Sequence, residues 1–357
     1  MISPDPSFWN GKRVFLTGHT GFKGGWLALW LKRLGAIVYG YALEPPTEPN
    51  LFTLARVGEG LEHQIGDIRD AATLRTAVDG LAPDIVLHLA AQPILRLSYD
   101  EPVETFATNL MGTVNLLEAV RHTPSAKVTL IITTDKCYEN REQIWPYREI
   151  DAMGGHDPYS ASKGCAELAM SAYGRSFFKQ GEAVVASVRA GNVIGGGDWA
   201  RDRLMTDIIA AVSQGKRPIL RNPGAIRPWQ HVMEPLSGYL RAAEYLWKNR
   251  SAAVESWNFG PETESEIPVG DLARHVCRLW GNGIEPEIVA DARNLHEAHW
   301  LRLDSSKARM QLGWTPRLSL STTLALTVDW YKAGLENKDM QSVTLQQIAA
   351  YEKEYGK

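Results

Sequence analysis

The chain has 357 residues, of which 44% are hydrophobic and 22% charged, the composition of an ordinary globular protein. Its formal net charge of -3, without a basic run, argues against a nucleic-acid partner and against an anionic membrane surface. The first residues lack the charged-then-apolar pattern of a secretion signal, and no apolar run approaches the length of a membrane span, so we expect a cytoplasmic protein. The 3 cysteines have no metal-like spacing, which indicates reduced thiols.

Residues 12–42 predict a strand, a glycine-rich turn, a helix and a second strand. The spacing of Gly18, Gly21 and Gly24 suits a tight turn, a close approach of backbone N–H groups to a pyrophosphate, and close packing of the helix on the strand. Glycines also gather in ordinary turns, but the strand before them and the helix after them favour a dinucleotide site.

The end of the second strand lacks the acidic residue that usually holds the adenosine ribose in such a site, because Ala42 stands there. Glu44 is one substitute, and a loosely held ribose is the alternative. No arginine follows the strand to take a 2′-phosphate, so NAD is expected rather than NADP. Asp67 and Ile68, at the end of a third strand over 61–67, are expected to bracket the adenine, and an ordinary turn or cap role remains open for Asp67.

The apolar run 84–91 predicts a central buried strand, and its small Ala90 and Ala91 leave room for a cofactor beside the backbone. Helical periodicity follows over 101–122 and includes Asn109. Asparagine is unfavourable inside a helix unless its amide makes a contact, so a structural contact and a role in the site are both open for Asn109.

Strands and helices continue to alternate up to residue 190, which predicts an α/β fold with a Rossmann-type, doubly wound parallel sheet. We expect residues 1–190 to form the NAD-binding domain. The glycine-rich stretch 191–199 predicts a crossing into a smaller lobe, 191–357, that binds the substrate. A late strand over 255–260 is expected to return to the sheet, so that the two domains interleave in sequence.

Tyr159 and Lys163 stand four residues apart in a predicted helix and therefore share one face. A tyrosine hydroxyl has a pKa of about 10, so it acts as a base near neutrality only beside a cation, and Lys163 is placed to be that cation. Thr134 follows the strand 127–133 at the same sheet edge. A solvated helix face is the alternative explanation for the pair.

Together, these motifs resemble the extended short-chain dehydrogenase/reductase family in its nucleotide-sugar branch, over essentially the whole chain. The segments 17–26, 133–138 and 195–199 are similar to those of CDP-glucose 4,6-dehydratases. The resemblance implies an NAD site formed by Gly18, His19, Gly21, Phe22, Gly24, Asp67, Ile68, Leu89, Ala90, Ala91, Asn109, Tyr159 and Lys163.

The resemblance also implies a reaction on CDP-glucose. Hydride leaves sugar carbon 4 for NAD while Tyr159, aided by Lys163, takes the proton of the 4-hydroxyl, to which Thr134 hydrogen-bonds. Asp135 resembles the acid that protonates the departing 6-hydroxyl, and the hydride returns to carbon 6. Lys136 stands where the related dTDP-glucose dehydratases carry a glutamate. It can remove the proton of carbon 5 only as a neutral amine, which requires burial or a neighbouring cation.

The substrate diphosphate requires fixed positive charge and hydrogen-bond donors. The second lobe offers these candidates, with Arg221 placed beside the nucleobase on family analogy: Asn192, Arg203, Arg221, Arg227 and Arg293. An ordinary surface role is the alternative for Arg203 and for Arg227. His296 and His299 lack the spacing and the third ligand of a zinc helix, so no metal is expected.

Different functions on the same scaffold remain open. A nucleotide-sugar 4-epimerase would keep Tyr159 and Thr134 but has no use for Asp135 and Lys136. A dTDP- or GDP-sugar dehydratase would use the same residues on a different nucleotide, and a non-catalytic NAD-sensing protein would bind the cofactor without turnover. We expect a homodimer or a homotetramer.

Overall fold

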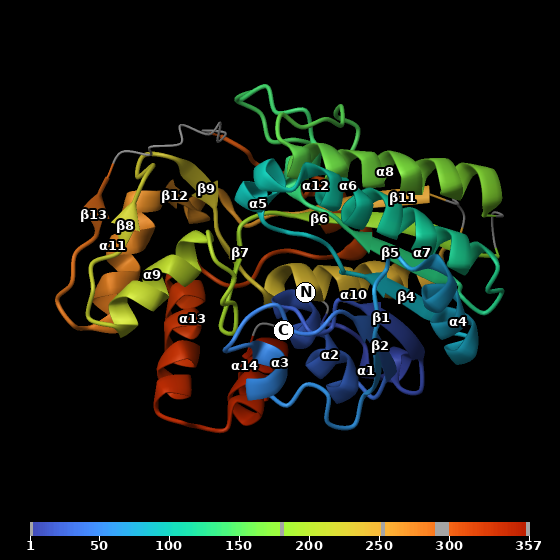
Figure 1. The fold of residues 1–357 in the computed structure, drawn as a ribbon, viewed down its shortest axis with the longest axis horizontal. Helices are drawn as coiled ribbons and strands as arrows, with labels where there is room; N and C mark the ends of the chain where they lie inside the picture. Colours follow the sequence, from blue (N-terminus) through green and yellow to red (C-terminus); the bar gives the residue numbers. More distant parts are fainter. Residues whose placement is uncertain (1–2, 179–181, 251–253, 290–299, 355–357) are drawn as a thin grey trace.

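A seven-stranded parallel sheet forms the centre of this computed structural model, which describes residues 3–178, 182–250, 254–289 and 300–354 (Figure 1). The sheet confirms the predicted doubly wound α/β fold. Its strand order is β11-β6-β5-β4-β1-β2-β3, and every neighbouring pair is parallel. The strands are β1 (Arg13–Thr17), β2 (Ile37–Ala42), β3 (Glu62–Ile65), β4 (Ile85–His88), β5 (Val128–Ile132), β6 (Val184–Ala190) and β11 (Val254–Phe259).

Helices cover both faces of the sheet, which explains why its central strands are apolar on both sides. In β1, Val14 and Leu16 belong to one core and Phe15 to the other. The first core includes α2 (Phe22–Arg33), α10 (Met233–Lys248) and α14 (Met340–Glu354). The second includes α4 (Ala71–Leu81), α7 (Gly112–Arg121) and α8 (Pro158–Phe177). Parts of the chain after residue 190, such as α10 and α14, thus pack on the same sheet as the N-terminal half.

The region predicted as one helix over 101–122 consists of three consecutive segments. After α5 (Leu95–Asp100), α6 (Pro102–Phe106) is followed by η1, a π-helical turn over Ala107–Met111, and then by α7. The predicted helical segment is therefore continuous from Pro102 to Arg121, and Asn109 lies in the π turn inside it. Such turns widen a helix locally and often mark functional sites.

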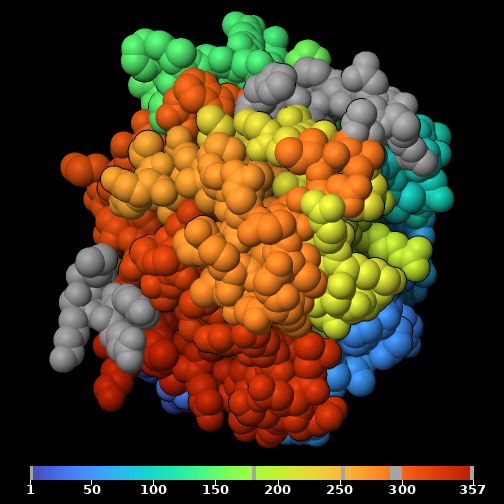
Figure 2. All heavy atoms as spheres, turned by 90° about the vertical axis from the view of Figure 1, so that its left-hand side faces the viewer, coloured from blue at the N-terminus to red at the C-terminus, as the bar shows by residue number. Residues whose placement is uncertain are grey.

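A smaller lobe lies at one end of the sheet, on the left in Figure 1 and facing the viewer in Figure 2. Two short ladders, β9 with β12 and β8 with β13, hold its loops together. Its helices are α9 (Leu204–Ser213), α11 (Val269–Trp280) and α13 (Leu320–Leu335). The remaining elements of the chain are α1 (Pro6–Trp9), α3 (Leu51–Leu54), η2 (Asp135–Cys137), β7 (Val193–Ile194), β8 (Ile219–Leu220), β9 (Ile226–Pro228), β10 (Gln230–His231), η3 (Thr263–Ser265), β12 (Glu266–Pro268), β13 (Glu287–Ile288) and α12 (Ser306–Leu312).

Within the described parts of the chain, no helix combines the length and the apolar character that a membrane span requires.

Candidate active site

A cavity of about 1220 Å³ opens where the carboxyl ends of the strands meet the smaller lobe. Pockets for one small ligand usually measure roughly 300–1,000 Å³, so this cavity has room for two ligands side by side. Most of the residues predicted for the site line it: Gly18, Gly21, Phe22, Gly24, Asp67, Ile68, Leu89, Ala90, Ala91, Thr134, Asp135, Lys136, Tyr159, Lys163, Asn192, Arg203, Arg221 and Arg227.

The glycine-rich turn has the shape of a phosphate cradle. Gly18 has a φ of +78°, and a Cβ atom there would lie 2.7 Å from the backbone nitrogen of Ala90. A Cβ atom on Gly24 would lie 2.0 Å from the carbonyl oxygen of Gly18, so α2 packs directly on the turn. Gly21 is the N-cap of α2 and has no side chain to cap the helix, which leaves the N–H groups of the first turn facing the cavity. These residues fit the pyrophosphate of a dinucleotide.

The side chain of His19 lies elsewhere than predicted. Its ring is buried under Gly40, where a Cβ atom would come within 2.5 Å of it, and it packs edge-on against Phe52. Burial lowers the His19 pKa to about 4, so the ring is neutral. It does not line the cavity, because the tight turn after Gly18 directs this side chain into the core. A direct contact of the His19 ring with a cofactor does not fit this geometry.

Asn109 is also absent from the cavity wall, and its amide is fully used in structural contacts. Its carbonyl oxygen accepts from the backbone N–H of Gln92 at 2.8 Å. Its nitrogen donates to the carbonyl of Gln92 at 3.0 Å and to the hydroxyl of Ser162 at 2.9 Å. Asn109 thus ties the loop after β4 to α8. The sequence left open a structural contact and a role in the site for Asn109, and these hydrogen bonds support the structural contact.

At the adenosine end, the carboxylate of Asp67 is already engaged. Arg69 binds it with Nε at 3.0 Å and 2.9 Å from its two oxygens, and this pairing holds the Asp67 pKa below its usual range. Ala42 ends β2, and Glu44 lines the cavity two residues later. Of the two interpretations left open for the ribose, the one that uses Glu44 has a carboxylate at the cavity rim.

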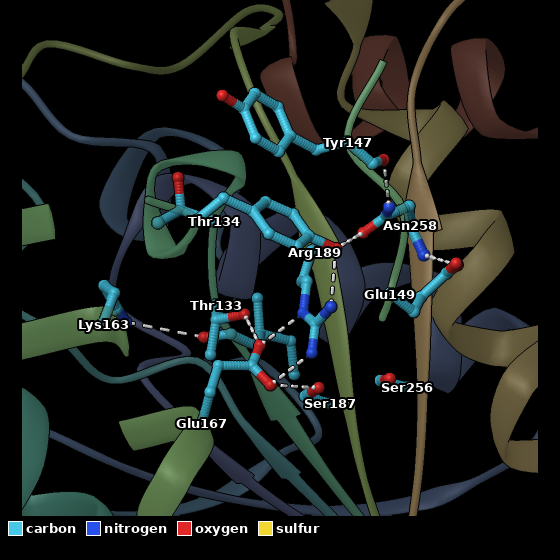
Figure 3. Close-up of polar contacts among 12 residues, drawn as sticks. Thr133, Thr134, Tyr147, Glu149, Lys163, Glu167, Ser187, Arg189, Ser256 and Asn258 are labelled. Carbon is cyan, nitrogen blue, oxygen red and sulfur yellow. Dashed lines mark hydrogen bonds and ion pairs between the residues drawn. The ribbon is translucent and has the colours of Figure 1, made fainter. Parts of the chain in front are cut away.

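The reactive groups come from two elements. Thr134 and Asp135 follow β5 directly, and Tyr159 and Lys163 lie in the first turns of α8, whose N-cap Asp157 accepts from the backbone N–H of Ser160 at 2.9 Å. Tyr159 and Lys163 are both buried. The ammonium of Lys163 points to the carbonyl oxygen of Ile132 at 3.5 Å, so α8 is held against the end of β5 (Figure 3).

Burial works against ionisation in this pair. It raises the pKa of Tyr159 to about 12, although a hydrogen bond with Thr134 and the charge of Arg203 lower it. Burial lowers the pKa of Lys163 to about 8, with Glu167 opposing the change. The tyrosine needs a further positive charge nearby before it can serve as a base near neutral pH.

Asp135 has one carboxylate oxygen in use and one unused. Oδ1 accepts from the hydroxyl of Thr134 at 2.8 Å, whereas Oδ2 is buried without a hydrogen-bond partner among the described residues. A Cβ atom on Gly191 would lie 1.9 Å from Oδ2, so only glycine fits opposite it. Oδ2 is thus packed against the backbone of Gly191, while the residue as a whole and its neighbour Lys136 line the cavity.

Sequence reasoning missed Lys23, which also lines the cavity. Its ammonium lies 3.2 Å from the hydroxyl of Tyr239 in α10. Burial, together with the charges of Lys163 and Arg203, lowers the Lys23 pKa to about 7, against the opposing effect of Asp135. The available signal was a lysine directly before the apolar stretch of α2, but without the neighbouring helices such a lysine is indistinguishable from a surface residue.

The predicted substrate arginines are placed differently from one another. Arg203 donates to the carboxylate of Asp198 at 2.7 Å, and the more exposed Arg221 lies 3.9 Å from Asp202. Arg227 is buried and donates to the carbonyl of Ile226 at 2.9 Å. Arg293 lies outside the described residues, as do His296 and His299. In the described ranges, no three histidine, cysteine or carboxylate side chains form a group suited to a metal ion.

A buried ion pair beneath the site was also missed. Glu167 in α8 accepts from Nε and Nη2 of Arg189 in β6, both at 2.8 Å. Arg189 donates onward to the hydroxyl of Tyr138 at 2.6 Å, and Tyr138 donates to Asn258 at 2.8 Å (Figure 3). The signal in the sequence is that Glu167 follows Lys163 by four residues, as Lys163 follows Tyr159.

A parallel Rossmann sheet with a glycine cradle and a Tyr–Lys pair at its strand ends defines an extended short-chain dehydrogenase/reductase. The chain belongs to the GDP-mannose 4,6 dehydratase family, whose model matches residues 15–327. The predicted membership of the nucleotide-sugar branch is thereby confirmed.

Two relatives illustrate the position of the chain in this family. It is 52% identical over 353 residues to the CDP-glucose 4,6-dehydratase of Salmonella typhimurium, covering 97% of this chain and 98% of that protein. It is 30% identical over 336 residues to the dTDP-glucose 4,6-dehydratase of Xanthomonas campestris, covering 88% and 92% of the two chains.

Solved structures show the same fold. A UDP-glucose-4-epimerase from Stenotrophomonas maltophila with bound NAD and formylated UDP-arabinopyranose matches with a TM-score of 0.79 and 20% identity, covering 91% of this chain and 99% of that one. The UDP-glucose 4-epimerase of Thermus thermophilus in complex with NAD matches with a TM-score of 0.77 and 24% identity, covering 90% and 99%. At these identities the likeness concerns the fold alone.

Proposed function

We propose that this chain is an NAD-dependent lyase that converts CDP-glucose to CDP-4-keto-6-deoxyglucose and water. The observation that carries the proposal is that one cavity holds both the Thr134–Tyr159–Lys163 set and the adjacent Asp135–Lys136 pair. An epimerase requires only the first set. The 52% identity to a CDP-glucose 4,6-dehydratase over nearly the whole chain supports the choice of nucleotide.

NAD bound in the cradle of Gly18, Gly21 and Gly24 supplies a positively charged acceptor that takes a hydride from carbon 4 and returns it to carbon 6. Tyr159 accepts the proton of the 4-hydroxyl, and Lys163 stabilises the phenolate. Thr134, which already hydrogen-bonds Tyr159, orients the same hydroxyl. Because burial raises the pKa of Tyr159, the residue can act as a base only while a positive charge next to its hydroxyl lowers that pKa.

Asp135 and Lys136 carry out the elimination. The carboxyl group of Asp135, a residue of the cavity wall, donates a proton to the 6-hydroxyl so that it leaves as water. Lys136 removes the proton of carbon 5, which the 4-keto group has made acidic. Asp135 and Lys136 line the same cavity, so both act on one bound sugar.

The diphosphate of the substrate is held by Arg203 and Arg227, with Asn192 nearby and Arg221 towards the nucleobase. Asp198 fixes the guanidinium of Arg203 and leaves its other N–H groups free to bind phosphate oxygens. The more exposed Arg221 lies at the rim, where a base would enter.

The working form is an assembly of two or four copies in the cytoplasm, where the product serves deoxysugars of surface polysaccharide. Support for the assembly comes from apolar side chains exposed on packed neighbours: Val103 in α6, Met111 in η1, and Leu168 and Phe177 in α8. Sedimentation of the purified chain gives the number of copies, and a monomer at working concentration contradicts this part.

The test of the activity is to incubate the purified chain with NAD and, separately, with the glucose conjugates of CDP, dTDP, GDP and UDP, and to follow the 4-keto product by its absorbance in alkali. Turnover of CDP-glucose well above the others is expected. Interconversion with CDP-galactose in place of dehydration indicates an epimerase, and no conversion of any substrate indicates a non-catalytic NAD-binding protein.

A further inference from the structure

The buried pair of Glu167 and Arg189 lies directly beneath the reactive residues. Their side chains are only 2% and 4% exposed. Besides Arg189, Glu167 accepts from the hydroxyl of Thr133 at 2.5 Å and from that of Ser187 at 2.6 Å. Both of its oxygens are therefore bound twice, which is the arrangement that a buried carboxylate needs to stay ionised.

This pair connects the two elements that supply the reactive groups. Thr133 immediately precedes Thr134 at the end of β5, and Glu167 lies on α8 one turn beyond Lys163 and two turns beyond Tyr159. These three residues share one face of the helix because they are spaced by four. Figure 3 shows Glu167 and Lys163 reaching the same stretch of β5. Through Thr133 and Arg189, the carboxylate fixes α8 against β5 and β6.

The pair also acts on Lys163 electrostatically. The negative charge of Glu167 favours the charged form of Lys163, whereas burial opposes it. Arg189 holds the pKa of Glu167 below its usual range, so the carboxylate keeps its charge. The other titratable groups that act on Lys163 or on the pair are His88 in β4, Lys23 in α2, Cys137 in η2, Tyr138 after it, and Glu149.

We propose that Glu167 and Arg189 are positioning residues of the reaction, which hold Thr134 against the face of α8 that carries Tyr159 and Lys163 and set the charge of Lys163. This inference rests on the proposed acid–base roles of Tyr159 and Lys163. A merely structural ion pair predicts a different result, because breaking it would lower stability and activity without moving the pH dependence of the reaction.

The signs follow from the geometry. Glu167→Gln removes the negative charge and leaves Arg189 uncompensated, and both effects favour a neutral Lys163. The alkaline limb of the rate profile, where Lys163 loses its proton, then moves to lower pH by about one pH unit. Arg189→Met leaves the carboxylate uncompensated and moves the same limb to higher pH. Tyr138→Phe is the matched control, because it removes a hydrogen bond to Arg189 without changing the charge.

The experiment measures kcat against pH for the wild type and the three variants with CDP-glucose and NAD. Opposite shifts for Glu167→Gln and Arg189→Met, with no shift for Tyr138→Phe, are expected. Equal shifts, or none, overturn the electrostatic role. Absence of turnover by the wild type counts against the proposed function instead, so the two failures are distinguishable.

A second measurement covers the case in which a charge-removing variant does not fold. Glu167→Asp keeps the charge but shortens the reach to Thr133 and Arg189. We expect it to lower kcat at least tenfold with the limb unmoved and KM for CDP-glucose little changed. A kcat equal to that of the wild type overturns the positioning role.

Discussion

Replacing Lys23 by methionine is expected to stabilise the ligand-free protein near neutral pH. Methionine has a similar length and helix propensity and keeps the contact with the ring of Tyr239. The folded state disfavours the positive charge of Lys23, because burial and the like charges of Lys163 and Arg203 lower the Lys23 pKa from 10.5 to about 7. At 1.36 kcal/mol for each pKa unit, this corresponds to a cost of about 5 kcal/mol for carrying the charge.

That figure is an upper limit, because Lys23 borders a cavity and keeps part of its contact with solvent. After this correction we expect a gain of about 1–2 kcal/mol in the free energy of unfolding. With a urea m value of about 3 kcal/mol/M for a large chain, the urea midpoint should rise by roughly 0.3–0.7 M. Tryptophan fluorescence reports the transition.

The pH dependence tests the cause. The pKa of Lys23 is lower in the folded state than in the unfolded chain, so the folded protein binds fewer protons between pH 7 and pH 10.5. The wild type therefore gains stability as the pH rises through that range, and the advantage of Lys23→Met shrinks. Lys338→Met, whose side chain is 59% exposed, is the control and should show neither effect. A midpoint for Lys23→Met that is unchanged at pH 7, or a difference that stays constant to pH 10, refutes the reasoning.

The other predictions concern the reaction. Tyr159→Phe loses one oxygen and should lower turnover by at least about 100-fold with NAD binding intact, and retention of a tenth of the activity contradicts its role. Lys136→Met should still oxidise carbon 4 but stop there, and the absorbance of NADH should then persist. Normal product formation by this variant would mean that another residue removes the proton of carbon 5. NAD should bind more tightly than NADP in a fluorescence titration, because no arginine follows Ala42, and the reverse order overturns this. Deuterium at carbon 4 of the substrate should appear at carbon 6 of the product by mass spectrometry, and loss of the label to solvent excludes transfer within one site.

Much of the architecture was readable from the sequence because buried parallel strands leave a strong pattern. All five residues of β5 are buried, and they form one apolar run in the sequence. The glycines of the cradle and the spacing of Tyr159 and Lys163 were equally readable, since each depends on local geometry that neighbouring residues determine.

What the sequence did not show depends on contacts between distant segments. His19 stands inside the motif predicted to bind the cofactor, yet the turn places its ring under Gly40, more than twenty positions along the chain. Asn109 lies in a π turn, and its amide is held by Gln92 and Ser162, which belong to other segments of the chain. No periodicity within one segment encodes either contact.

The electrostatic effects of the charged groups in the site also depend on the folded chain. Lys23, Lys163 and Arg203 come from three separate segments, and the charges of Lys163 and Arg203 lie close enough to Lys23 to lower its pKa. A fold selected only for stability would not gather like charges at the end of a buried sheet. Their arrangement fits a reaction in which the hydroxyl of Tyr159 must lose its proton against the effect of burial, since surrounding cations favour the phenolate. Glu167 opposes the effect of burial on Lys163, and this explains why a carboxylate outside the cavity wall lies on the same helix face as the reactive pair.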